Sequence, residues 1–340
     1  MWEPGCIGTL ELPNRFIRSA TAEFWANNDN GIISKEYFDL YSELAQGEIG
    51  LIISGHLYVI DEGKAHDYMA GLSHDFHMEE LIRLTNMIHN KGGKIAAQLN
   101  HGGFYSVSKK GPSLEENKDT QSMTEEDIDN VITGFSAAAL RAKKSGYDAI
   151  QIHSAHGYLL SQFLSKRVNL RNDDWGGSVE NRSRLLLTVY KAVRNAVGNR
   201  YPVFVKMNGS DDPYEGFPVE EAMEVTKKLV EEGIDAIEIS GMKSTRSFKE
   251  EHEGYFAETG KRIKKQMGDI PLILVGGHRT FSRIQKLHEE FADFISMCRP
   301  LIREPNLILK FKNGKERADC SSCSKCIRKR EEGIIKCLNL

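Results

Sequence analysis

Eight short apolar runs, each followed by a segment with helical spacing of apolar side chains, constrain the fold of this chain more than any other feature. The runs begin near residues 14, 48, 94, 147, 202, 234, 270 and 292. An apolar run that ends in small residues, as at residues 49–55, is typical of a strand buried on both faces of a parallel sheet. Eight such units in a chain of 340 residues predict an α/β fold of the (β/α)8 TIM barrel type rather than an open, doubly wound sheet.

The segments between these runs carry apolar side chains at the intervals of an amphipathic helix. We expect helices near residues 37–46, 78–89, 124–145, 181–197, 219–231, 259–267, 280–288 and 302–311. No Gly-x-Gly-x-x-Gly follows the first strand, which argues against a Rossmann fold. The polar segment 100–123 is predicted to be a long functional loop. We expect the barrel over residues 1–312 and a short Cys-rich extension over residues 313–340.

Charge and hydropathy exclude several classes of protein. The net charge of −3 gives no sign of a nucleic acid or an anionic membrane as partner. The chain has no apolar run of about 20 residues, the length that a membrane-spanning helix needs. The first five residues, Met-Trp-Glu-Pro-Gly, lack the basic and apolar regions of a signal peptide. We therefore expect a cytoplasmic protein that acts on a small-molecule substrate.

Two imidazoles and a phenol follow the fourth apolar run. His153, His156 and Tyr158 lie within six residues at the predicted carboxyl end of that strand, and barrels carry their chemistry at this end. Two imidazoles can donate hydrogen bonds to one oxygen that gains negative charge, and a phenol can deliver a proton. A histidine at a strand end more often serves packing or hydrogen bonding, so the pattern alone leaves both uses open.

Two loops late in the chain predict a phosphate site. Gly276 and Gly277 follow the seventh run, and Cys298 and Arg299 follow the eighth. In (β/α)8 barrels the loops after strands seven and eight often bind phosphate. Backbone N–H groups exposed by glycine, together with a guanidinium, suit a phosphate monoester. A glycine pair alone is weak evidence, and its place in the repeat is what strengthens it.

Lys206 lies in the fifth apolar run, where a charged side chain is costly unless it is paired. Lys206 either meets a carboxylate or faces an anionic ligand at the barrel mouth, and we favour the ligand because of the nearby phosphate site. The segment 171–182 combines paired glycines with acids and arginines. Such residues can lock a loop by charge-assisted hydrogen bonds, and we interpret this segment as scaffold.

Four of the six cysteines lie close together near the end of the chain. They are Cys320, Cys323 and Cys326, with two residues between neighbours, and Cys337, with ten residues between it and Cys326. This spacing fits tetrahedral thiolate ligation of Zn or an iron–sulfur cluster. Reduced thiols without a metal are the alternative. Six cysteines in a chain of this length do not indicate a disulfide framework.

Five sequence blocks stand in a fixed order along the chain. They read NRFIRSAT at residues 14–21, QLNHGG at 98–103, HSAHGYLLSQFL at 153–164, WGGSVENR at 175–182 and CRPLI at 298–302. Over residues 10–310 the chain resembles the Old Yellow Enzyme family of NADH:flavin oxidoreductases, and the third and fourth blocks together are specific for it. Members are FMN-containing (β/α)8 barrels that reduce activated alkenes with NAD(P)H, and the resemblance implies this fold, these cofactors and this activity.

The resemblance also implies a role for each matching position. Contacts with the isoalloxazine and ribityl parts of FMN fall to Ser19, Ala20, Thr21, Gln98 and Lys206, with Lys206 beside flavin N1 and the C2 carbonyl. Contacts with the FMN phosphate are assigned to Gly277 and Arg299, and we count their neighbours Gly276 and Cys298 with the cofactor site. His153 and His156 would polarise the carbonyl oxygen of the substrate, and Tyr158 would protonate its α-carbon.

The chain departs from the family pattern in three places. Ala22 stands where the family often has Thr or Cys bonded to flavin O4, so one hydrogen bond that tunes the flavin potential is missing or supplied elsewhere. Cys298 replaces a usual Gly. The four C-terminal cysteines resemble the cluster-binding segment of the dienoyl-CoA reductase and trimethylamine dehydrogenase branch, but the long nucleotide-binding part of that branch does not follow Cys337. Structural Zn and a [4Fe-4S] cluster served by a separate electron-transfer protein therefore both stay open.

We expect an FMN-dependent ene-reductase that moves hydride from NAD(P)H through flavin N5 to the β-carbon of an α,β-unsaturated carbonyl compound. The sequence does not name this compound, and it fits a monomer or a homo-oligomer. The second hypothesis is an amine or C–H dehydrogenase that passes electrons to an iron–sulfur cluster, and the third is a non-catalytic flavin redox sensor. A barrel that binds a sugar phosphate is a weaker fourth. Iron and acid-labile sulfide in the purified protein would favour the second.

Overall fold

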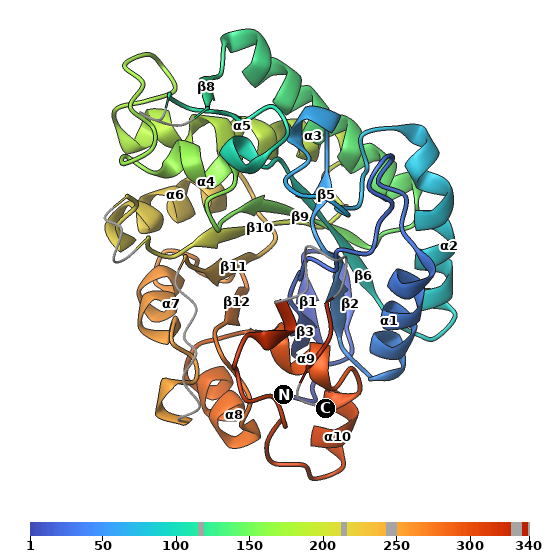
Figure 1. Cartoon of the computed structure of the whole chain (residues 1–340). Coiled ribbons are helices and arrows are strands. Elements are labelled where there is room, and N and C mark those ends of the chain that lie inside the picture. Colours follow the sequence, from blue (N-terminus) through green and yellow to red (C-terminus); the bar gives the residue numbers. More distant parts are fainter. Residues whose placement is uncertain (115–118, 212–215, 243–249, 328–334, 339–340) are drawn as a thin grey trace.

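Eight parallel strands form a closed barrel at the centre of the computed structural model, which describes residues 1–114, 119–211, 216–242, 250–327 and 335–338 (Figure 1). The strands pair in the order β4-β3-β13-β12-β11-β10-β9-β6, and β6 pairs with β4 to close the ring. Their bounds are β3 (Phe16–Arg18), β4 (Leu51–Ile53), β6 (Ile95–Asn100), β9 (Ala149–Ser154), β10 (Val203–Asn208), β11 (Ile237–Ser240), β12 (Leu272–Val275) and β13 (Phe294–Met297). The predicted (β/α)8 barrel is confirmed.

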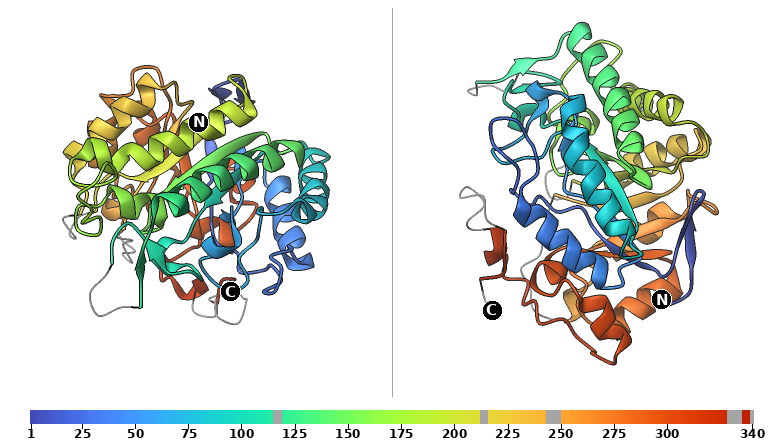
Figure 2. Two further views of the ribbon diagram at one scale, coloured as in Figure 1. Left: turned by 90° about the horizontal axis from the view of Figure 1, so that it is seen from above. Right: turned by 90° about the vertical axis from the view of Figure 1, so that its right-hand side faces the viewer.

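Helices surround this barrel on its outside (Figure 1, Figure 2). They are α1 (Lys35–Gln46), α2 (Met78–His89), α3 (Glu125–Lys144), α5 (Val179–Val197), α6 (Val219–Glu231), α7 (Ala257–Lys264), α8 (Phe281–Glu290), α9 (Arg299–Arg303) and α10 (Leu307–Lys312). The predicted bounds of α2 and α6 are confirmed. The single helix predicted over residues 302–311 is wrong. Glu304 leaves the helical conformation with φ −135° and ψ 82° because Pro305 follows it, and the helix splits into α9 and α10.

Several short elements were not predicted. They are the hairpin β1 (Gly5–Ile7) and β2 (Leu10–Leu12), the edge strand β5 (Leu57–Tyr58), the pair β7 (Lys110–Gly111) and β8 (Gln121–Ser122), the helix α4 (Leu159–Leu164), and the 3-10 turns η1 (Asp61–Gly63), η2 (Asp75–His77), η3 (Gly103–Tyr105), η4 (Glu250–His252) and η5 (Lys325–Ile327). The hairpin β1–β2 buries Ile7 and Leu12 against Phe204 and Phe294 inside the barrel. It therefore plugs the amino-terminal end of the barrel with apolar side chains.

A polar layer lies above this plug, two residues further along each strand. Side chains of a strand alternate between its two faces, so Gln98, Gln151, Lys206 and Glu238 share the barrel interior. The strand register sets Lys206 beside Glu238 and Gln98 beside Gln151. All four residues are at most 2% exposed. The barrel thus changes from apolar to hydrogen-bonding side chains toward its carboxyl end, where the site lies.

The segment 171–182 is locked in the way that its composition predicts. Arg171 donates to the carbonyl oxygens of Pro112 and Met123, at 3.1 and 2.7 Å, and also binds Asp173. Because these bonds join the segment to the long loop after β6, the segment supports the rim of the barrel mouth.

The Cys-rich extension runs back against the barrel. The amide of Ala318 donates to Arg279 O at 2.9 Å, and Thr280 pairs with Arg317 in an isolated bridge. Among the described residues, no helix is long and apolar enough to cross a membrane.

Candidate active site

A buried carboxylate organises the polar layer of the barrel. Glu238 accepts hydrogen bonds from Ser19, Ser296 and Gln151, each at 2.7 Å. Lys206 Nζ lies 3.2 Å from Glu238 Oε1 and donates to Ser19 Oγ at 2.7 Å. Burial alone would raise the pKa of Glu238, but Lys206, Ser296, Ser19 and Gln151 together hold that pKa below its ordinary value. The centre of the layer is therefore an ion pair between Lys206 and Glu238, and the Glu238 carboxylate is fully hydrogen-bonded.

The structure gives Lys206 the carboxylate that was one of its two predicted partners, namely Glu238 on the neighbouring strand. The anionic ligand that we favoured as its partner stays a prediction. Sequence reasoning missed Glu238, although a Glu inside the apolar run Ala-Ile-Glu-Ile is the same signal that singled out Lys206. Gln98 does not contact Glu238 directly but donates a hydrogen bond of 2.7 Å to Gln151, which in turn donates to Glu238.

The structure brings His153, His156 and Tyr158 together at the carboxyl end of β9. The ring centroid of His153 lies 5.1 Å from that of His156 and 5.2 Å from that of Tyr158. The chain turns sharply here, because His156 and Gly157 adopt left-handed conformations with φ 63° and 77°. The turn is held by the amide of His156, which donates to Asn208 Oδ1 at 3.1 Å. These three side chains can therefore act on one ligand.

Both imidazoles of this group are neutral. Burial lowers the pKa of His156 to about 3, with a further effect from the Lys206 charge. Burial also lowers the pKa of His153 well below its ordinary value. The amide of Ala155 points at His153 Nδ1 from 3.3 Å, so Nδ1 is the acceptor and the ring proton lies on Nε2. His156 Nε2 shares a hydrogen bond of 2.7 Å with Ser240 Oγ.

Two further histidines at the mouth were missed by sequence reasoning. The carbonyl of Asp67 can only accept, so His66 Nδ1, 2.6 Å away, carries a proton. In a neutral His66 ring, Nε2 then accepts from His56 Nε2 at 2.9 Å. This leaves His56 Nδ1 to accept from Asn100 Nδ2 at 3.3 Å. The His56 ring packs edge-on against Tyr158, with centroids 5.1 Å apart, and so fixes one side of the site.

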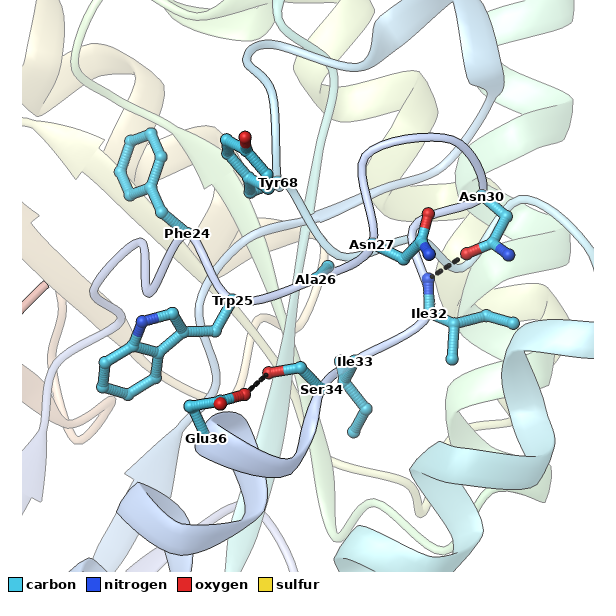
Figure 3. A pocket seen from close by; sticks show the side chains of 10 residues that line it. All are labelled: Phe24, Trp25, Ala26, Asn27, Asn30, Ile32, Ile33, Ser34, Glu36 and Tyr68. Carbon is cyan, nitrogen blue, oxygen red and sulfur yellow. Dashed lines mark hydrogen bonds between the residues drawn. The ribbon is translucent and has the colours of Figure 1, made fainter. Parts of the chain in front are cut away.

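Two cavities at the barrel mouth share Phe24 in their lining. A cavity of about 490 Å³ is lined by Phe24, Ala65, His66, Asp67, Tyr105, His156 and Tyr158. A second cavity, of about 620 Å³, has Phe24, Trp25 and Tyr68 on one side and Asn30 and Ile32 on the other (Figure 3). The Phe24 ring stacks on His66 with centroids 4.0 Å apart. Phe24 therefore forms part of the wall of both spaces.

The residues predicted to bind phosphate also lie near one another. Gly276 and Gly277 have φ 147° and 73°. A Cβ added to Gly277 would lie 2.9 Å from the ring of Tyr255, and Tyr255 in turn interacts with Arg299. Cys298 accepts a hydrogen bond of 3.1 Å from Thr21, which joins this loop to the predicted flavin contacts. Ala20 packs against the apolar plug.

The four C-terminal cysteines line one small cavity of about 20 Å³ together with Arg299 and Arg303. No group of three or more His, Cys, Asp or Glu side chains is close enough to hold a metal ion in the part of the chain that the structure describes. The four thiols would therefore have to move closer together to bind one ion. The soft thiolate donors suit Zn or iron.

FMN fits the residues at the barrel mouth. Asn100 Oδ1 is buried and finds no hydrogen-bond partner among the described residues, and Gln98 lies two positions before it on the same face of β6. A planar ring with alternating N–H and C=O groups would satisfy such amides. At the other side of the mouth, Arg299 and the Gly276–Gly277 turn offer the donors that a phosphate needs. Both halves of the cofactor thus find matching groups.

The buried histidines predict loss of stability in acid. Burial lowers the pKa of His101 to about 3 and that of His278 to about 4. Below pH 6.5 the unfolded chain gains protons that the folded chain does not, so the free energy of unfolding falls by about 1.4 kcal/mol per pH unit for each such histidine until the folded pKa is reached. Burial raises the pKa of Glu23 to about 7. Below pH 7 the folded chain therefore binds one proton at Glu23 that the unfolded chain does not, and this offsets the effect of one histidine only.

We expect His278→Leu to reduce the slope of the free energy of unfolding against pH between pH 6.5 and pH 4. The reduction should correspond to about one proton fewer taken up on unfolding. Urea unfolding at several pH values measures both slopes. Equal slopes would contradict a neutral, buried His278.

A closed (β/α)8 barrel with a polar mouth that fits a planar, phosphorylated cofactor defines the class of the flavin barrels. The chain matches the family model described as NADH:flavin oxidoreductase / NADH oxidase over residues 1–318, and it belongs to that family.

Solved structures agree with this assignment. The chain is 26% identical to 2-naphthoyl-CoA reductase in its complex with 2-naphthoyl-CoA, with a TM-score of 0.90 over 98% of this chain and 56% of that one. It thus spans little more than half of that protein. An Old Yellow Enzyme homologue from Zymomonas mobilis is 24% identical, with a TM-score of 0.80 and 94% of each chain covered. Morphinone reductase is 23% identical, with a TM-score of 0.79 over 95% of this chain and 92% of that one. The similarity to the last two proteins is one of fold alone.

Proposed function

We propose that this protein is an FMN-dependent oxidoreductase that reduces the alkene of an α,β-unsaturated carbonyl compound with NAD(P)H. The observation that carries the proposal is the convergence of His153, His156 and Tyr158 at the mouth of a barrel of this family. When bound, the flavin accepts hydride from NAD(P)H and delivers it to the β-carbon of the substrate.

Two groups of residues at the barrel mouth would hold FMN. Contacts with the ring system and ribityl chain are assigned to Ser19, Ala20, Thr21, Gln98 and Lys206, and contacts with the phosphate to Gly276, Gly277, Cys298 and Arg299. The ion pair with Glu238 leaves the polar layer nearly neutral, so Lys206 would contribute hydrogen bonds more than net positive charge.

The histidines would bind and polarise the substrate carbonyl oxygen. His153 offers its Nε2–H, because Nδ1 already accepts from a backbone amide. His156 offers its Nδ1–H when the Ser240 hydroxyl donates to Nε2. Two neutral donors in a buried site stabilise negative charge on that oxygen as it develops. Tyr158 would then donate its phenolic proton to the α-carbon.

The visible spectrum and metal content of anaerobically purified protein test this proposal. We expect bound FMN that NAD(P)H bleaches, and either Zn or iron at the four cysteines. A colourless protein that does not bind added FMN would contradict the proposal and favour a sugar-phosphate barrel.

One observation motivates a test for a second function. The cysteines Cys320, Cys323, Cys326 and Cys337 share a cavity with Arg299, a predicted phosphate ligand. A cluster so placed could take electrons from the flavin, as in an amine or C–H dehydrogenase. Iron with acid-labile sulfide, and oxidation of an amine in a single turnover, would support this function over alkene reduction.

We further propose that residues 1–312 form the barrel, that residues 313–340 form the Cys-rich extension, and that the protein is cytoplasmic.

We also propose that the substrate extends past Phe24 into the second cavity. The aromatic side chains of Trp25 and Tyr68 line that space (Figure 3), and burial of an aromatic face stabilises an apolar group by about 2 kcal/mol. We expect Trp25→Ala to raise the KM of a bicyclic enone about 30-fold and that of 2-cyclohexenone much less. Steady-state kinetics with both enones provide the measurement. Equal changes would contradict a separate subsite.

A further inference from the structure

We propose that Arg299 couples the four-cysteine site to the flavin phosphate site, so that metal at the cysteines strengthens FMN binding. This inference rests on the proposed function, because it needs both FMN and a metal. Arg299 NH1 donates to Ser322 O at 3.0 Å and to Ser324 Oγ at 3.1 Å. These two acceptors flank Cys323, one residue to each side. Arg299, which is predicted to bind the phosphate, therefore also binds the centre of residues 320–326, which we call the cysteine loop.

The cysteine loop has a backbone that needs external support. Ser322 and Ser324 have φ 55° and 57°, in the left-handed region that residues other than glycine seldom adopt. Such conformations persist where their surroundings determine them. Ligation of Cys320, Cys323 and Cys326 to one metal would fix the loop on both sides of each serine. The Ser322 carbonyl and the Ser324 hydroxyl would then stay in place for Arg299.

A guanidinium can serve both sites at once. It carries five N–H donors in a planar fork, so two bonds to the cysteine loop are compatible with a bidentate contact to phosphate. The side-chain entropy of arginine opposes that contact whenever the fork is not already oriented. Acceptors held still by a metal remove part of this cost, and the benefit appears as tighter FMN binding.

The helix α9 ties the two sites together at a second point. Arg303 lies one turn after Arg299, and its NH1 donates to Cys337 Sγ at 3.4 Å. Both arginines line the cavity that the four cysteines share. Cys298, the residue before Arg299, accepts from Thr21 at 3.1 Å. Movement of the cysteines on metal binding would therefore reach the phosphate loop through α9.

The experiment compares FMN with riboflavin, which lacks the phosphate. Purified protein is stripped with a chelator, and the metal it contained is restored with Zn²⁺ or with ferrous iron and sulfide. Dissociation constants follow from quenching of flavin fluorescence. We expect metal removal to weaken FMN binding about tenfold and riboflavin binding less than about twofold. By linkage, FMN should strengthen metal binding by the same factor.

Three variants locate the coupling. Arg299→Lys removes the planar fork, so its FMN affinity should be low and independent of metal. Ser324→Ala should reduce the effect of metal to about threefold, because one of the two bonds remains. Ile302→Val is the matched control, since Ile302 lines the same cavity and its apolar side chain cannot hydrogen-bond to Arg299 or to a cysteine, so the tenfold effect should stay intact.

The possible failures are distinct. If metal removal weakens FMN and riboflavin equally, if it strengthens FMN binding, or if Arg299→Lys keeps the tenfold effect, the coupling through Arg299 is overturned while the proposed function stands. If the purified protein binds no FMN, the proposed function falls as well. If it binds FMN but holds no metal and takes up neither Zn²⁺ nor iron, the coupling alone falls.

Discussion

Replacing Glu238 with Leu is expected to lower the free energy of unfolding of the FMN-free protein by about 3–5 kcal/mol. The reason is the buried ion pair. Lys206 and Glu238 are 2% and 0% exposed, and Ser19, Ser296 and Gln151 all donate to the same carboxylate. Without Glu238, a charged ammonium and three polar groups are left in the barrel. Guanidinium-induced unfolding measures the loss.

Two further variants separate charge from shape. The double variant Lys206→Met/Glu238→Leu removes both charges, so it should be at least about 2 kcal/mol more stable than Glu238→Leu alone. Glu238→Gln keeps the side-chain shape and should fall between Glu238→Leu and the unmodified protein. If the losses of the two single replacements Lys206→Met and Glu238→Leu simply add in the double variant, the pair is not coupled.

Replacing Tyr158 with Phe is expected to slow alkene reduction by about 10² to 10⁴-fold, the usual contribution of a positioned proton donor. Reduction of the bound flavin by NAD(P)H should change less than about twofold, because that half-reaction needs no proton from Tyr158. The ring of Tyr158 contacts His153 and His56, at 5.2 and 5.1 Å between centroids. Phe keeps these ring contacts and loses only the hydroxyl. Stopped-flow absorbance follows each half-reaction separately.

Tyr105→Phe is the matched control for Tyr158→Phe. Tyr105 lines the same cavity and meets Tyr158 edge-on at 6.1 Å. Its hydroxyl has no assigned role, so both half-reactions should stay close to those of the unmodified protein. An equal loss in both half-reactions of Tyr158→Phe would remove Tyr158 from the role of proton donor.

The sequence predicted the barrel because strands buried on both faces are written as continuous apolar runs. It missed α4 because all six of its residues are buried, which leaves no amphipathic pattern to find. It missed the hairpin β1–β2 because strands of three residues are too short for an alternating pattern. It joined α9 to α10 because the apolar spacing continues across Pro305.

The site was predictable where its residues are neighbours in the chain. His153, His156 and Tyr158 follow one strand, so the strand end alone placed them together. Lys206 and Glu238 lie 32 residues apart, and only the register of β10 against β11 reveals the pair. The contact between His56 and His66 depends on how two loops fold over the mouth, which local sequence does not encode.

Anaerobic rapid mixing of the unmodified protein tests the central claim most directly. NAD(P)H is added first, and 2-cyclohexenone or a bicyclic enone follows once the flavin absorbance has bleached. The account predicts that the enone restores the absorbance and that one saturated ketone forms for each NAD(P)H consumed. Bleached flavin that no enone reoxidises would contradict alkene reduction as the function of this protein.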